Sequence, residues 1–325
     1  MRSARTVRPT DIVALVTFDG RVYHDAARPW DRVGKEVEAP HPLESALEQW
    51  FSFATGKHTW VHIQGQTLRG LVSARKRGNR RAWEVDCLLA VGEDEQAVAT
   101  GLLEQVSRGA AQAKVRSLFL RMERDAPLVA AARKAGFRPY LLERLYRRDE
   151  PAATGPAAAT LPLRRRTAAD AWALFRLYSQ CTPEPVRREE APTFEEWQAN
   201  VDVRAGGRGG GSLVLERDGR VLGWLRTRPD GKAGRLDVLT PPDAADCARA
   251  LLEEGLAGLA GRAPLFALVP VYLTSVATAL RDAGFQEQGE FVVMVKRLTV
   301  PVGEARTVPA RAAVESASFL VSCAP

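Results

Sequence analysis

Two carboxylates two residues apart, Glu84 and Asp86, are the clearest candidates for acid–base chemistry in this 325-residue sequence. They lie in an apolar run, 83–91, whose composition predicts a β-strand. Because successive side chains of a strand point to opposite faces, residues two apart share a face. A carboxylate that lines a substrate groove can act as a general base. The other interpretation is a solvated strand face without chemistry.

Histidine and cysteine spacing predicts no metal site. His58 and His62 are four residues apart near a predicted strand, and no third ligand stands beside them in the sequence. Isolated strand or turn histidines are the simpler interpretation. The four cysteines are scattered without a CxxC pair, so the sequence predicts neither a zinc site nor a disulfide framework. Reduced thiols favour a cytoplasmic location.

The charge balance favours acidic partners such as nucleic acid or a phosphorylated cofactor. The net charge is +7, and five positive charges fall within the seven residues 75–81. Such a turn could bind phosphates with a salt-dependent affinity. The simpler interpretation is a solvated hairpin tip, so nucleic acid is a secondary hypothesis. No apolar run approaches the roughly 20 residues that cross a bilayer, so no membrane partner is predicted.

The chain divides at a segment with three prolines, residues 151–162, which is predicted to be a linker. The predicted units are a first domain over 1–150, a second over 163–300 and a tail over 301–325. Regular apolar patterns stop near the start of that tail. The oligomeric state does not follow from the sequence.

The same order of predicted elements occurs in both halves, and each half has a helix that ends in Ala-Gly-Phe before two strands. Glycine suits the position just after a helix. Hairpins and crossover helices together predict an α/β fold with mixed sheets. Strands are predicted at 60–64, 70–74, 83–91, 117–121, 137–142, 144–148, 212–217, 220–228, 235–239, 265–269, 285–288 and 291–298, and helices at 95–113, 127–135, 168–178, 243–260 and 273–283, with a further short strand and helix over 11–18.

This order, with its endings at Gly136–Phe137 and Gly284–Phe285, resembles the GCN5-related N-acetyltransferase (GNAT) family over about residues 5–148 and 161–299. The resemblance implies two tandem GNAT-like acyl-CoA N-acyltransferase domains. It implies acetyl-CoA as the acyl donor and a small-molecule or peptide amine as the acceptor. The acceptor site would be built by residues 20–48, with Tyr23, His24 and Trp30 among the candidate contacts.

In that family acetyl-CoA lies where the fourth and fifth strands separate, and a Q/R-x-x-G-x-G/A loop presents main-chain amides to the pyrophosphate. The loop matches Gln96–Gly101, or a register two residues earlier that begins at Asp94. In the second half the aligned stretch 243–248 places two aspartates where phosphate should lie. The residues implied for cofactor binding are Leu89, Ala90, Val91, Gln96, Ala97, Ala99 and Gly101.

The family's acid, a tyrosine four residues before the helix-ending glycine, is replaced by Ala132 and Leu280. Tyr272 is a displaced candidate acid, although it could simply pack its ring at a helix start. Glu84 and Asp86 are the candidate bases. Two hypotheses stay open: an acetyl-CoA-dependent N-acyltransferase, or a catalytically inactive GNAT-fold binding or scaffold protein that could contact nucleic acid through its basic turns.

Overall fold

The structure, a computed structural model, describes residues 4–6, 25–34, 57–65, 67–151, 161–205 and 210–299. The expected elements over 11–18, the candidate contacts Tyr23 and His24, most of the linker and the tail lie outside these residues. Among the helices in the described ranges, none is long and apolar enough to cross a membrane.

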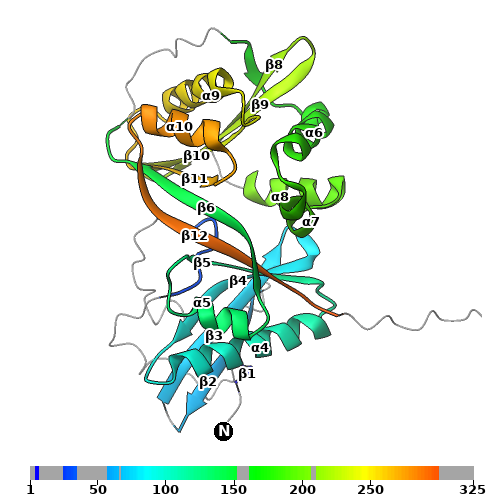
Figure 1. Cartoon of the computed structure of the whole chain (residues 1–325), viewed down its shortest axis with the longest axis vertical. Helices are drawn as coiled ribbons and strands as arrows, with labels where there is room; N and C mark the ends of the chain where they lie inside the picture. The colour runs from blue at the N-terminus through cyan, green and yellow to red at the C-terminus, as the bar shows by residue number, and fades with distance from the viewer. Residues whose placement is uncertain are drawn as a thin grey trace, which may run out of the picture.

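The first half forms a mostly antiparallel sheet covered by two helices, close to the ranges that the sequence predicts (Figure 1). The elements are β1 (Arg5–Thr6), β2 (His58–Gln64), β3 (Thr67–Arg77), β4 (Asn79–Ala90), α4 (Glu95–Gln112), β5 (Ser117–Glu123), α5 (Val129–Lys134) and β6 (Arg138–Arg148).

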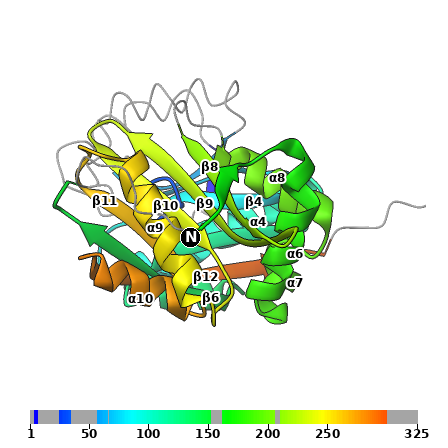
Figure 2. The same cartoon turned by 90° about the horizontal axis from the view of Figure 1, so that it is seen from above.

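The second half repeats this order, with two additional helices, α7 and α8, that the sequence patterns did not place. Figure 2 shows α6, α7 and α8 on one side of this half and α9 and α10 on the other. The elements are β7 (Leu163–Arg165), η3 (Ala168–Asp170), α6 (Ala171–Cys181), α7 (Glu184–Glu190), α8 (Phe194–Ala205), β8 (Gly211–Arg217), β9 (Arg220–Asp230), β10 (Ala233–Leu239), α9 (Ala245–Gly258), β11 (Leu265–Pro270), α10 (Thr274–Asp282) and β12 (Gln286–Arg297).

The twelve strands of the described residues join in one mixed sheet, in the order β1-β2-β3-β4-β5-β12-β6-β11-β10-β9-β8-β7. The last strand of each half is exchanged: β12 lies between β5 and β6, and β6 lies between β12 and β11. In Figure 1 these two strands run side by side through the middle of the molecule. The two halves therefore share their central strands.

The prediction of two strands after each Ala-Gly-Phe is wrong, because each half has a single long strand there. The predicted break in the first half was at the charged Glu143. That side chain is instead buried within β6, since it forms an ion pair with Arg121. The predicted break in the second half coincides with a register shift between Glu287 and Gly289, which bends β12 without ending it.

The basic segment 75–81 is not a polar turn. Strand β3 continues to Arg77, and only Gly78, with φ +48°, separates it from β4. The strand continues because its charges have partners: Arg75 bonds Asp31 at 2.6 Å, and Arg77 pairs with Glu190 at 3.3 Å. The predicted Asp218–Gly219 hairpin is confirmed, with φ of +52° and +70° at its two central residues.

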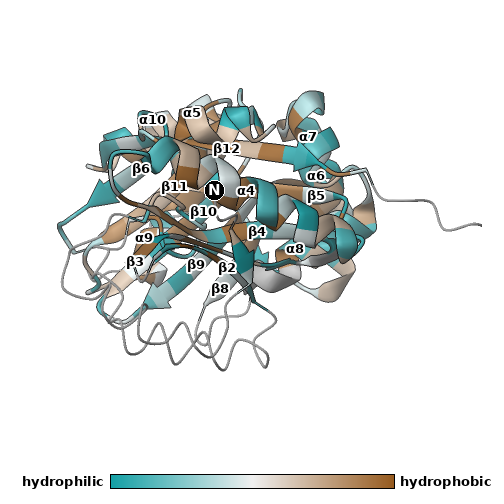
Figure 3. Ribbon diagram, turned by 90° about the horizontal axis from the view of Figure 1, so that it is seen from below, coloured by the Kyte–Doolittle hydropathy of each residue, from teal (hydrophilic) through white to brown (hydrophobic). Residues whose placement is uncertain are grey.

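Each half has its own hydrophobic core on the helix side of the sheet, and each core includes residues of the exchanged strand. Val292 and Met294 of β12 lie in the core under α4 and α5, and Tyr146 of β6 lies in the core of the second half. In Figure 3 the central strands β5, β11 and β12 carry hydrophobic colour over much of their length. Burial of this shared apolar surface fixes the strand exchange.

Candidate functional site

Strands β4 and β5 pair in parallel over only three residues and then separate. The pairs join Ala82–Glu84 to Ser117–Phe119. Beyond them the main-chain groups that face the gap need other partners, because buried amides and carbonyls rarely stay unpaired. We call this separation the first notch.

Four residues of the chain's own N-terminal region, Asp25–Arg28, fill the first notch, and we call them the insert. The amide of Ala26 donates to the Leu88 carbonyl at 3.0 Å, and the amide of Leu88 donates to Asp25 Oδ1 at 2.9 Å. On the other edge, the amide of Arg28 donates to the Arg121 carbonyl at 2.8 Å. All four insert residues are buried. The insert therefore bonds both β4 and β5 as an added segment of main chain.

The buried carboxylate of Asp25 organises the insert. It also accepts the amide of Ala27 at 2.9 Å and pairs with Arg32 at 3.3 Å. Arg32 donates to the Asp86 carbonyl of β4 at 2.9 Å, which attaches the segment at a third point. Burial raises the pKa of Asp25 despite these favourable contacts.

The residues after the insert are held by the second half of the chain. Arg235 of β10 donates to the carbonyls of Trp30 at 3.1 Å, Asp31 at 3.4 Å and Val33. The guanidinium of Arg228 lies 4.5 Å from the centre of the Trp30 ring, a cation–π contact. Burial lowers the pKa of Arg235. Residues 25–34 therefore bind the first notch at one end and the second half at the other.

A ladder of alternating charges crosses β3, β4, β5 and β6 on the sheet face opposite α4. Glu84 lies between two guanidiniums, 3.5 Å from Arg75 and 3.7 Å from Arg121. Arg121 in turn bonds Glu143 at 2.6 Å, and its side chain is only 1% exposed. The Glu84 carboxylate is therefore held in place by two guanidiniums.

Asp86 is fully buried at a bulge of β4, where it has no partner residue on β3. Its Oδ1 accepts the Ser73 hydroxyl at 2.5 Å, and its Oδ2 lies 3.6 Å from Lys57 Nζ. Glu84 and Asp86 therefore contact β3 residues that are themselves two apart, Arg75 and Ser73. The two carboxylates lie on one face, both engaged by neighbouring side chains.

The start of α4 offers few free amides to an anion. The amide of Glu95 donates to the Gly92 carbonyl at 3.3 Å, and those of Ala97 and Val98 donate to the Asp94 carbonyl at 3.0 Å. Three consecutive carboxylates, residues 93–95, surround this helix start. One carboxylate about 4 Å from a phosphate costs on the order of 4 kcal/mol at an effective dielectric near 20.

Strands β10 and β11 separate in the same manner after pairing Gly234–Leu236 with Leu265–Ala267, which gives a second notch. No main-chain segment within the described ranges bonds both of these strands there. Thr240, immediately after β10, is fully buried, and its hydroxyl has no hydrogen-bond partner among the described residues. The following helix α9 carries Asp246 in its first turn, so an anion there would meet a carboxylate.

Solved structures with the same arrangement exist. A GCN5-related N-acetyltransferase from Sphaerobacter thermophilus matches with a TM-score of 0.56 at 16% identity, over 90% of this chain and 95% of that chain. The chain has the GNAT fold. A tandem GNAT protein from the clavulanic acid biosynthesis pathway matches with a TM-score of 0.46 at 13% identity, over 88% of this chain and 93% of that chain. No family model and no curated protein matches the sequence.

The first half of this GNAT fold does not fit acetyl-CoA, because the insert holds the main-chain groups of Leu88 that face the first notch. The Val91 amide points away from the notch and donates to Arg69 of β3 at 2.9 Å. Gln96 donates its side-chain amide to the Pro127 carbonyl at 2.6 Å. The segment Gln96–Gly101 lies inside α4 rather than in a loop. The remaining residues implied for the cofactor lie at the end of β4 and in the first turns of α4: Leu89, Ala90, Ala97 and Ala99.

The three candidate catalytic residues come from both halves of the chain. Glu84 and Asp86 lie in the first half, whereas Tyr272 follows β11 and contacts the Thr182 hydroxyl at 3.5 Å. Burial raises the pKa of Tyr272, so it is a weaker acid than an ordinary tyrosine. Trp30, an expected substrate contact, is stacked under Arg228 instead.

Sequence patterns missed the insert and the buried Arg121–Glu143 pair. The insert has no apolar periodicity and no motif. Only the Arg121 side of the pair had a detectable signal, because Arg121 interrupts the apolar run 118–122, whereas strand 138–148 carries several charges besides Glu143. Charges at strand positions that periodicity would bury indicate a buried ion pair.

Proposed function

We propose that this chain is a GNAT-fold binding protein that does not transfer acyl groups through its first half. The observation that supports this is the insert, which hydrogen-bonds Leu88 on one edge of the first notch and Arg121 on the other. A pantetheine chain would need the same groups of β4. Acetyl-CoA binding there would have to displace four buried residues.

The charges around the first notch support the same proposal. The candidate base Glu84 is held between Arg75 and Arg121. The basic segment 75–81 gives little support for a nucleic-acid partner, since Arg75 and Arg77 are paired with carboxylates of the chain itself. The candidate partners are therefore small molecules rather than phosphate backbones.

A second candidate function is acyl-CoA binding by the second half. It is favoured by the buried, unpartnered hydroxyl of Thr240 beside the second notch. A bound pantetheine amide could satisfy this hydroxyl, which otherwise carries a desolvation cost of about 1–3 kcal/mol. The carboxylate of Asp246 in the first turn of α9 opposes this candidate.

Calorimetric titration with acetyl-CoA distinguishes the two candidates. We expect no saturable heat from the wild-type protein at ligand concentrations up to about 1 mM. We also expect no release of CoA when primary amines are added. The variant Asp25→Ala removes the carboxylate that bonds Leu88, and it tests whether loosening the insert creates an acetyl-CoA site. The variant Asp282→Ala, at an exposed position, is its control.

Two results would overturn the proposal. Saturable binding that Asp25→Ala strengthens would show a competent cleft beneath the insert. Saturable binding that Thr240→Val abolishes would assign acyl-CoA to the second half. Thr240→Val keeps the side-chain shape and removes only the hydroxyl, so its folded state is expected to persist.

A further inference from the structure

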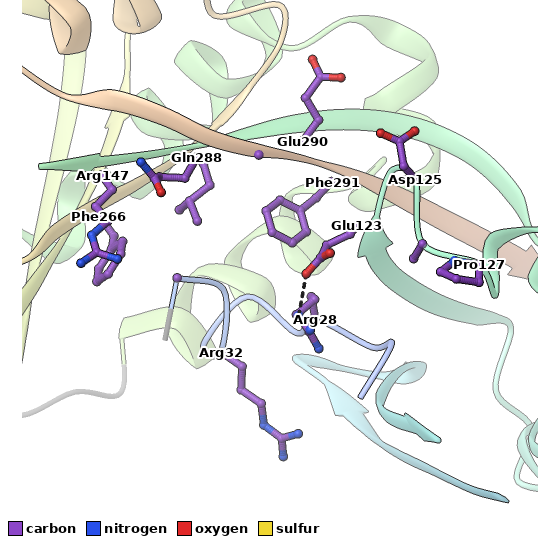
Figure 4. A pocket seen from close by; sticks show the side chains of 14 residues that line it. Arg28, Arg32, Glu123, Asp125, Pro127, Arg147, Phe266, Gln288, Glu290 and Phe291 are labelled. Carbon is purple, nitrogen blue, oxygen red and sulfur yellow. Dashed lines mark ion pairs between the residues drawn. The ribbon is translucent and has the colours of Figure 1, made fainter. Parts of the chain in front are cut away.

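A cavity of about 540 Å³ lies where the two halves meet, on the sheet face that also carries residues 25–34. Figure 4 shows it between the strands β6 and β12 above and the segment 28–34 below. Its volume is within the range of small-molecule sites. We call it the junction pocket; its walls come from β5 and the following loop, β6, β11, β12 and residues 28–34.

The floor of the junction pocket is apolar and preformed. Leu145, Phe266 and Phe291 are buried in one cluster with Val33. Gly34, with φ +80°, allows the chain to pass directly over Phe266, since a Cβ atom there would lie 2.7 Å from that ring. Two aromatic rings on a fixed floor favour a ligand with a flat or branched apolar body.

One side of the pocket carries carboxylates. Glu123 ends β5 and Asp125 follows in the next loop; in Figure 4 the Glu123 carboxylate points toward Arg28, whereas the Asp125 carboxylate points away from it. The side chain of Glu123 is 48% exposed and pairs with Arg28 at 3.3 Å through one oxygen. A carboxylate has about four lone-pair sites, so Glu123 can accept further donors. This side of the pocket suits an ammonium group.

The other side carries a guanidinium. Arg147 lies on the opposite side of the pocket from Asp125 in Figure 4, near Phe266, whereas the Arg32 side chain points down and away from the strands toward its partners Asp25 and Asp86. The Arg147 guanidinium is 5.9 Å from the centre of the Phe266 ring, and only its Nε is taken up by Asp149, at 2.7 Å. A guanidinium has five N–H donors in a planar fork, which suits a carboxylate.

We propose that the junction pocket binds a small zwitterion with an apolar or aromatic body, of the class of a free aromatic amino acid. Its ammonium would lie against Glu123, its carboxylate against Arg147, and its body beside Phe266 and Phe291. The opposed charges separated by an apolar floor match this class, whereas a simple anion or cation would meet a repelling group at one end. The inference goes beyond the proposed function, and the pocket shares with the first notch the contact between Glu123 and Arg28 of the insert.

Calorimetry with L-phenylalanine as the probe tests the proposal. We expect saturable binding, and we expect binding at least about tenfold weaker for 3-phenylpropionate, phenethylamine and L-alanine, each of which lacks one of the three features. Glu123→Gln and Arg147→Met should each weaken L-phenylalanine by about tenfold, since each removes one charged partner. Arg188→Met, in an exposed pair with Glu184, is the matched control and should bind normally.

Three outcomes would overturn the proposal: no saturable binding of L-phenylalanine at about 10 mM, binding that neither pocket variant alters, or equal binding of phenethylamine. Both variants change partly exposed side chains, and an unchanged Tm would show that they fold. The titration with acetyl-CoA is a separate experiment from the titration with L-phenylalanine. If the junction pocket does not bind its ligand, only the second titration is affected, and if the first notch does bind acetyl-CoA, only the first is.

Discussion

The two notches of this chain have the same strand geometry and different contents. In each, a parallel pair of strands separates after three residue pairs. The first is filled by Asp25–Arg28 and bordered by the charge ladder through Arg121. At the second, Leu268 of β11 packs with Phe266 on the face where Arg121 of β5 binds Glu143, and β10 carries the ion pair of Asp237 with Arg226 at 3.3 Å. The same strand separation is thus filled by the chain's own main chain in one half, whereas no described main-chain segment bonds both strands in the other.

The largest expected effect comes from removing the centre of the charge ladder. Arg121→Met should lower the free energy of unfolding by about 3–5 kcal/mol, because Glu143 would remain buried without its cation and Glu84 would keep only Arg75. Chemical denaturation measures this. The double variant Arg121→Leu/Glu143→Leu removes both charges of the buried pair and should recover part of the loss. An Arg121→Met loss no larger than that of the exposed Arg188→Met would contradict the ladder's importance.

A second comparison uses matched glycines, Gly70 on β3 and Gly223 on β9, each the fourth residue of its strand beneath a helix. A Cβ at Gly70 would lie 2.6 Å from the Leu89 carbonyl oxygen, which cannot move easily, whereas at Gly223 it meets the end of the Leu251 side chain at 2.5 Å. We expect Gly70→Ala to cost about 2–3 kcal/mol and Gly223→Ala about 1 kcal/mol in unfolding free energy. Equal losses would show that the two helix–sheet contacts are equally adaptable.

The smallest expected effect is a difference in pH dependence between the halves. Burial raises the pKa of Asp25, so its contribution to stability is complete below the unfolded value of 3.8 and is lost as pH rises through the folded pKa. The hydrogen bonds from Arg164 lower the pKa of Asp170, so its contribution is present above 3.8 and is lost as pH falls through the folded pKa. Each group changes stability by at most about 1.4 kcal/mol per pH unit.

Unfolding experiments from pH 3 to pH 8 on Asp25→Asn and Asp170→Asn check these signs. The stability advantage of the wild type over Asp25→Asn should shrink as pH rises, and its advantage over Asp170→Asn should shrink as pH falls. If the stability difference between wild type and variant changed with pH in the same direction for Asp25→Asn and Asp170→Asn, the result would contradict a buried Asp25 with a raised pKa.

Local patterns in the sequence determined the repeated order of elements, the Asp218–Gly219 hairpin and the helix endings at Gly136 and Gly284. These features depend on apolar periodicity and on residues that tolerate positive φ, and both are properties of a few neighbouring positions. The fold class followed from that order.

Only the tertiary structure decided which strands pair and what fills each notch. These features depend on contacts between residues that are tens to more than a hundred positions apart in the sequence. They are the exchange of β6 and β12, the burial of Glu143 and the position of Asp25–Arg28 in the first notch. From the sequence alone, a carboxylate within a strand pattern indicates a loop or a solvated face. Only the tertiary structure shows whether a cationic side chain pairs with it. Glu143 and Glu84 became part of a buried face because Arg121 lies between them, and no local pattern contains that information.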